Sequence, residues 1–199
     1  MSYDQPPVDA GATLVSDDDR AGLIPSYITL RSELNEAEQR NILAAEDWAY
    51  ARSRNVLDRA FLDTLHRQMF GKVWRWAGTH RMTAKNISVD AYRIPTELQQ
   101  LFDDCRFWID RDTYAPDEIA ARFHHRLVWV HVYPNGNGRH ARLATQLLLR
   151  SLGQPPFTWG SGGVNAALTD PGTVRERYIA ALKAADHHDY GPLFEVMRA

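Results

Sequence analysis

One short stretch of the chain, residues 131–142, carries most of the side chains that could do chemistry. It reads His-Val-Tyr-Pro-Asn-Gly-Asn-Gly-Arg-His-Ala-Arg. Its two glycines let the backbone approach a ligand closely, and a helix starting there would direct free N–H groups at an anion. Arg139 and Arg142 are three residues apart, so both guanidinium groups can lie on one helix face and hold a di- or triphosphate. His131, with an ordinary pKa of about 6.5, could act as a base beside this loop. The pattern therefore predicts a phosphate-binding site with a general base.

The composition bounds the class of protein. The chain has 199 residues, 44% of them hydrophobic, and a net charge of −2. That is enough for one domain with a core, and the charge gives no basic field for nucleic acid. Cys105 is the single cysteine, so no internal disulfide can form. We expect residues 1–22 to be a flexible leader without a signal peptide, and we expect no membrane span. The default expectation is a cytoplasmic protein, and a homo-oligomer stays open.

The elements that must position this stretch are mostly helical by pattern. Apolar residues recur at helical spacing along most of the chain. Asn35 and Glu38 have the spacing of a capping box, which predicts a helix starting at Asn35. Residues 79–96 lose the helical period and contain β-friendly residues, which predicts a small β-hairpin or an extended flap. The expected helices span residues 25–33, 35–54, 57–70, 96–110, 116–130, 139–152, 170–186 and 190–198.

These motifs resemble the Fic family, whose signature is roughly HxFx(D/E)GNGRxxR. The upstream Trp-Ala-Gly-Thr-His-Arg at 76–81 and the following extended segment also look like the Fic core. The likeness covers about residues 35–155, and the early segment at 22–26 is similar to the sub-group called mobile mystery protein B. The resemblance implies an all-α Fic-fold helical bundle with a β-hairpin flap. It divides the chain into the leader, an inhibitory helix at 23–34 and a Fic domain at 35–199.

The resemblance also implies an activity, since Fic proteins typically transfer AMP from ATP to a hydroxyl of a target protein. His131 would deprotonate a Ser, Thr or Tyr hydroxyl. The anion hole would consist of Gly136, Asn137 and Gly138. Arg139 would hold the phosphate tail and Arg142 the γ-phosphate. The flap, with Asn86, Ile87 and Ile94, would dock the target segment as an added strand.

Two further features follow from the same resemblance. Asn135 stands where the family has an acid that orients Mg²⁺, and an amide oxygen is a weaker, uncharged ligand. Thr29 and Glu33 match an inhibitory motif, (S/T)xxxE(G/N), in which the glutamate pairs with the second arginine of the signature, here Arg142. Leu34 departs from that motif. The glutamate would compete with phosphate for the same guanidinium group.

Three functions remain open at this point. The first is AMP transfer with ATP and Mg²⁺, with autoinhibition by Glu33. The second is another phosphate reaction on the same scaffold, such as removal of AMP or transfer of another group, which Asn135 keeps open. The third is a silent nucleotide-binding module, which would not need a base at His131.

Overall fold

The computed structural model describes residues 21–25, 27–28, 31–83, 88–160 and 173–199. Within these ranges the chain forms seven α-helices, one 3₁₀ turn and no sheet. The predicted all-α class is therefore confirmed. The elements are α2 (Arg31–Tyr50), α3 (Arg59–Phe70), η1 (Ala91–Arg93), α4 (Ile94–Asp110), α5 (Pro116–Val130), α6 (Asn137–Ser151), α7 (Thr173–Ala185) and α8 (Gly191–Arg198).

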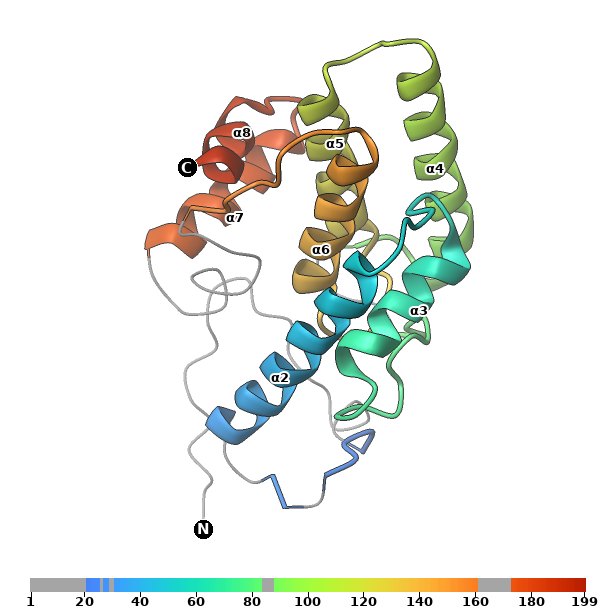
Figure 1. The fold of residues 1–199 in the computed structure, drawn as a ribbon, viewed down its shortest axis with the longest axis vertical. Coiled ribbons are helices and arrows are strands. Elements are labelled where there is room, and N and C mark those ends of the chain that lie inside the picture. Colours follow the sequence, from blue (N-terminus) through green and yellow to red (C-terminus); the bar gives the residue numbers. More distant parts are fainter. Residues whose placement is uncertain (1–20, 26, 29–30, 84–87, 161–172) are drawn as a thin grey trace.

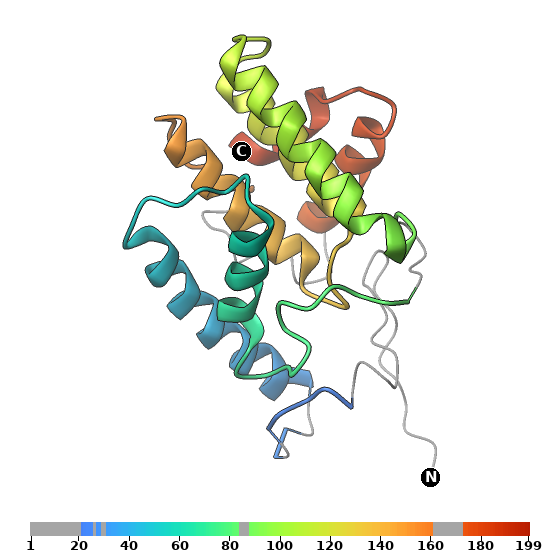
Figure 2. The same cartoon turned by 90° about the vertical axis from the view of Figure 1, so that its right-hand side faces the viewer.

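Helix α6 is the central element of the bundle. Its residues from His140 to Leu149 are all buried, as expected of a helix surrounded by others. It packs along α5 and also contacts α3 and α2, while α4 packs on α5 and α8 on both α5 and α7. Figures 1 and 2 show α2 and α3 at one end of the bundle and α7 and α8 at the other, with α6 between them.

Two apolar clusters fill the bundle. The larger cluster contains side chains from each of the helices α2, α3, α4, α5 and α6, among them Leu62, Leu65 and Phe70 of α3. The smaller cluster lies under the C-terminal helices and contains Phe157, Trp159 and Tyr178. Helices α5 and α6 contribute side chains to both clusters. The two ends of the loop that joins these helices are therefore anchored in both parts of the core.

The ends of the helices follow from local sequence. Asp58 caps α3, since its carboxylate accepts from the Phe61 N–H at 2.9 Å. Pro116 lies in the first turn of α5, where its missing N–H costs nothing. Helix α5 ends at His131 in the left-handed conformation, and Gly136, with φ +78°, precedes α6. The predicted site is therefore the tight connection between two long buried helices.

The structure corrects two predictions about the N-terminal half. Helix α2 begins at Arg31, so Asn35 lies in its second turn and is not a helix cap. The flap is not a hairpin in its described part, since Ala91–Arg93 form a 3₁₀ turn and α4 already begins at Ile94. Pro95 in the first turn of α4 favours that early start over the β propensity of its neighbours. Residues 84–87 lie outside the described part of the chain.

The segment before α2 meets the segment that follows α3 through a short antiparallel contact. Leu23 and Trp74 form an isolated bridge, with the Ile24 N–H donating to the Val73 carbonyl at 2.8 Å. No helix in the described ranges has both the length and the apolar character needed to cross a membrane.

Candidate active site

His131 lies at the C-terminus of α5 in an unusual backbone conformation. Its φ and ψ are 52° and 63°, a left-handed geometry that costs a non-glycine residue about 1–2 kcal/mol. The buried Arg81 guanidinium stabilises this turn, because its Nε donates to the His131 carbonyl at 2.6 Å. The same guanidinium donates to the Thr83 carbonyl at 2.8 Å. Arg81 therefore joins the residue proposed as base to the segment predicted as a flap.

The loop after His131 presents backbone donors at the start of α6. The first helical hydrogen bond runs from the His140 N–H to the Gly136 carbonyl at 2.9 Å. The N–H groups of residues 137–139 precede it and have no acceptor within the helix, as at any helix start. The Gly136 N–H, in contrast, donates to its neighbour Asn135 Oδ1 at 2.6 Å. The donors available to an anion are therefore those of Asn137, Gly138 and Arg139.

The side chain of Asn137 holds the loop from within. Its Oδ1 accepts from the Tyr133 N–H at 2.9 Å and its Nδ2 donates to the Tyr133 carbonyl at 2.7 Å. The side chain is buried and used in this paired contact. Asn137 therefore offers its backbone N–H, and not its amide group, to a ligand.

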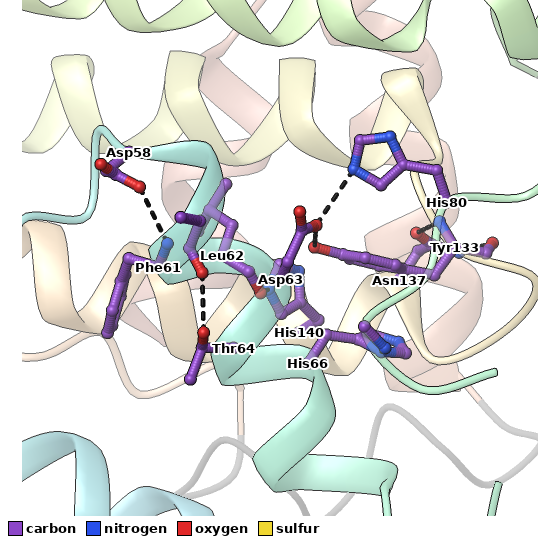
Figure 3. Close-up of polar contacts among 12 residues, drawn as sticks. Asp58, Phe61, Leu62, Asp63, Thr64, His66, His80, Tyr133, Asn137 and His140 are labelled. Carbon is purple, nitrogen blue, oxygen red and sulfur yellow. Dashed lines mark hydrogen bonds and ion pairs between the residues drawn. The ribbon is translucent and has the colours of Figure 1, made fainter. Parts of the chain in front are cut away.

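Tyr133 of the loop belongs to a partly buried polar network that sequence reasoning missed. The Tyr133 hydroxyl donates to Asp63 Oδ1 at 3.0 Å, and His80 Nε2 lies 3.0 Å from the same oxygen. Figure 3 shows Asp63 of α3 between these two partners. The signature has an aromatic residue at position 133, but nothing in the local sequence links it to α3, 70 residues earlier in the chain.

The His66 ring holds the loop by a hydrogen bond and adopts a single tautomer. Its Nδ1 accepts from the Gly78 N–H at 3.0 Å, so the proton must be on Nε2, which donates to the Asn135 carbonyl at 3.0 Å. The ring also stacks on Tyr133 with centroids 3.7 Å apart. Burial, mainly, lowers the pKa of His66 well below its usual value, which keeps the ring neutral.

The two arginines of the motif have different surroundings. Arg139 Nη1 donates to Glu38 Oε2 of α2 at 2.7 Å. Arg142 is 3% exposed, and burial lowers its pKa to about 10, with smaller contributions from the positive charges of Arg139 and Arg175. Positive charge from α6 and α7 is therefore concentrated beside the loop, which suits a phosphate chain. The sequence did not single out Glu38 or Arg175 as site residues, because both partnerships are long-range.

Asn135 is a poor foundation for a Mg²⁺ site. Its Oδ1 already accepts the Gly136 N–H, and the group is uncharged. Mg²⁺ in phosphate sites is usually held by one or two carboxylates beside the phosphates. The described residues contain no group of three or more His, Cys, Asp or Glu side chains arranged for a metal. Among the described residues, the surroundings of Asn135 therefore do not fit a Mg²⁺ site.

The remaining predicted site residues are not all brought to the loop. Glu33 lies half-buried in the first turn of α2. Ile94 is fully buried in the core at the start of α4, so its side chain is not on the surface where a target would dock. Thr29, Asn86 and Ile87 lie outside the described residues.

Some known proteins are similar to this chain in sequence or in fold. A 132-residue match, 30% identical, relates the chain to "Protein adenylyltransferase Fic" of Nematostella vectensis, covering 64% of this chain and 28% of that protein. "Protein adenylyltransferase fic-1" of Caenorhabditis briggsae is 36% identical over 97 residues, which are 48% of this chain and 17% of that protein. The chain thus matches less than a third of the length of either relative.

Solved structures show the same architecture. A BepC protein with bound AMPPNP from Bartonella tribocorum has a TM-score of 0.66 at 18% identity, covering 92% of this chain and 97% of that one. An N-terminal Fic domain with bound ADP from Bartonella quintana has a TM-score of 0.66 at 20% identity, with 87% and 86% of the chains covered. At these identities the likeness concerns the fold alone. The sequence model of the Fic/DOC family matches residues 56–149 of this chain, a segment that contains α3, α4, α5, the loop and most of α6.

Proposed function

We propose that the protein transfers AMP from ATP to a side-chain hydroxyl of a protein target. One observation carries this proposal. The N-terminus of α6 offers three backbone donors and an arginine next to His131, whose backbone is held in a strained conformation by Arg81. Strain that a structure maintains at such a place is typical of a functional site. The curated relatives named as protein adenylyltransferases support the same reaction.

In this proposal the α6 donors hold the phosphates and His131 moves the proton. The N–H groups of residues 137–139 donate to oxygens of the α- and β-phosphates, while Arg139 and Arg142 hold the phosphate tail. His131 takes the proton from the target hydroxyl as its oxygen attacks the α-phosphorus. The bond from that phosphorus to the β-bridging oxygen breaks, so pyrophosphate leaves and AMP remains on the target.

The proposal includes a brake. Glu33 of α2 would pair with Arg142 and prevent the γ-phosphate from docking. A carboxylate and a phosphate compete directly for one guanidinium group, which makes the pair a switch if nucleotide reaches the site. The mobile mystery protein B likeness, the cytoplasmic location, the target and any homo-oligomer stay predictions.

The test uses ATP labelled on the α-phosphate with lysate proteins and the full chain. We would compare the wild type, Glu33→Gly, Glu33→Gly with His131→Ala, and a matched control, Glu33→Gly with His125→Ala. His125 is also on α5 but pairs with Asp186 at 2.9 Å, away from the loop. We expect strong protein labelling in Glu33→Gly and in the control, and none with His131→Ala.

Other outcomes separate the rival functions. If no protein is labelled in any variant, including the enzyme itself, the proposed AMP transfer is refuted. Label from the γ-phosphate would indicate a kinase-like reaction, and loss of label from a target already carrying AMP would indicate AMP removal. Nucleotide retained with no transfer of any kind, and unaffected by His131→Ala, would indicate a binding module.

A further inference from the structure

Glu38 of α2 is a buried carboxylate with both oxygens engaged. Its side chain is 5% exposed. Oε1 accepts from Trp74 Nε1 at 2.6 Å, and Oε2 accepts from Arg139 Nη1 at 2.7 Å. Glu38 therefore directly links Trp74, in the segment after α3, to Arg139, the first arginine of the stretch at residues 131–142.

Trp74 cannot easily move away from Glu38. Its side chain is buried, and its indole stacks on Trp76 with centroids 4.9 Å apart. The backbone N–H of Trp74 donates to the Phe70 carbonyl at 2.9 Å, and its backbone forms the bridge to Leu23. The Trp74 indole, which donates to the Glu38 carboxylate, is thus itself held in place by ring stacking and by the backbone contacts of Trp74.

Arg139 is fixed on the side away from solvent and keeps donors for a ligand. Its guanidinium carbon lies 4.9 Å from the centre of the Phe70 ring, and that ring also lies under Gly136 of the loop. Glu38 engages Nη1, while a guanidinium has five N–H donors. The side chain remains 17% exposed. Phosphate can therefore bind Arg139 without removing Glu38.

A phosphate that displaced Glu38 would leave a buried carboxylate without its cation, which is strongly unfavourable. The contact is therefore suited to orient the arginine and not to be released. This differs from the proposed Glu33 brake, in which the carboxylate must leave its arginine for the nucleotide to dock.

We propose that Glu38, held by Trp74, is a positioning residue that orients Arg139 toward the phosphate tail of a nucleoside triphosphate. The nature of the ligand rests on the proposed function, whereas the orienting contact does not. Glu38 touches no reacting atom and acts through Arg139.

The test measures binding by calorimetry with three probes: AMPPNP, adenosine and inorganic tripolyphosphate. All variants carry Glu33→Gly, so that the proposed brake does not block the phosphates. Glu38→Gln keeps an oxygen for Trp74 but loses the charge that holds Arg139. We expect about tenfold weaker AMPPNP and tripolyphosphate binding, in line with the loss of a charge-assisted hydrogen bond, and unchanged adenosine binding. Glu36→Gln is the matched control, since Glu36 is on the same helix, is 72% exposed and lies 3.9 Å from Arg40. It should change nothing.

Two further variants show whether Glu38 acts through Arg139. Arg139→Ala should weaken both phosphate probes, and adding Glu38→Gln to it should cause no further loss. Trp74→Phe keeps an aromatic ring but removes the indole donor, and we expect a smaller loss confined to the same two probes. Thermal midpoints of all variants identify any that fail to fold, and Trp74→Phe then tests the proposal independently of Glu38→Gln.

Several results would overturn the proposal. Tighter AMPPNP binding in Glu38→Gln would make Glu38 a competitor of phosphate. If Glu38→Gln weakens adenosine binding as much as binding of the phosphate probes, the role of Glu38 is purely structural. The same conclusion follows if the losses from Glu38→Gln and Arg139→Ala add in the double variant. A Glu33→Gly protein that binds tripolyphosphate but labels no protein with AMP would refute the proposed function and leave the Glu38 result interpretable. A Glu33→Gly protein that binds none of the phosphate probes would refute the Glu38 proposal itself.

Discussion

The two glycines of the loop, Gly136 and Gly138, should respond oppositely to substitution by alanine. A Cβ at Gly136 would lie 2.6 Å from Phe70 Cζ, and the residue has φ +78°. The left-handed backbone costs about 1–2 kcal/mol, and a clash in a packed core about 1–3 kcal/mol more. Gly136→Ala should therefore lower the free energy of unfolding by roughly 2–5 kcal/mol.

Gly138→Ala is the matched comparison two residues later. Gly138 lies in the first turn of α6, and a Cβ there would meet no atom of the described structure within 4 Å. Alanine in a helix is favoured over glycine by up to about 1 kcal/mol, so the fold should be unchanged or slightly more stable. The same open space is where phosphate would approach the α6 donors. Gly138→Ala should therefore weaken AMPPNP binding without loss of stability.

Urea unfolding, followed by circular dichroism, measures both free energies, and calorimetry measures the binding. Equal stabilities for the two variants would refute the assigned backbone and the contact with Phe70. A third variant sharpens the result, because Phe70→Leu added to Gly136→Ala removes the ring and should restore part of the lost stability. AMPPNP binding unchanged in Gly138→Ala would refute the assignment of the phosphate to the start of α6.

Three further predictions concern the groups around the loop. Burial lowers the pKa of three histidines, to about 3 for His124, to about 4 for His140 and well below the usual value for His66. The unfolded chain binds protons on these histidines below pH ~6.5 and the folded chain does not, so stability is complete above that pH and is lost as the pH falls below it. For His124 and His140 together, urea unfolding should give roughly 3 kcal/mol less at pH 5.5 than at pH 7.5, with a further loss from His66, and a flat profile would contradict these surroundings. Asn135→Asp places a carboxylate at the position where the Fic signature has an acid. AMP labelling should then depend more strongly on the Mg²⁺ concentration, and a Mg²⁺ titration that is unchanged would show that position 135 has no role in metal binding. Tyr133→Phe removes one hydroxyl donor and keeps the ring, which should lower unfolding free energy by about 1 kcal/mol in urea, whereas a loss of several kcal/mol would mean that the ring itself moves.

The sequence was sufficient for most of the helices and for the composition of the loop. Helical periodicity and Pro116 located α5 at residues 116–130, as observed. Glycine spacing and the two arginines located the connection between α5 and α6. These signals are local, because apolar spacing, proline and glycine act within one or two turns of the chain.

Local signals also failed where packing decided the outcome. The capping-box spacing suggested a helix start at Asn35, but α2 begins at Arg31, and Glu38 serves Arg139 instead of the helix end. β-friendly residues suggested a hairpin or extended flap within residues 79–96, but Ile94 enters the core as the first residue of α4. In both cases contacts with distant residues outweighed the local preference.

The sequence by itself thus determined an all-α chain with a glycine loop, a histidine and two arginines at the start of a helix. Tertiary structure alone decided what holds these groups: Arg81 on the His131 carbonyl, His66 and Asp63 under the loop, and Glu38 on Arg139. The physical reason is that the partners of buried polar groups are set by which helices pack together. Residues 101 positions apart, such as Glu38 and Arg139, leave no periodic trace in the sequence.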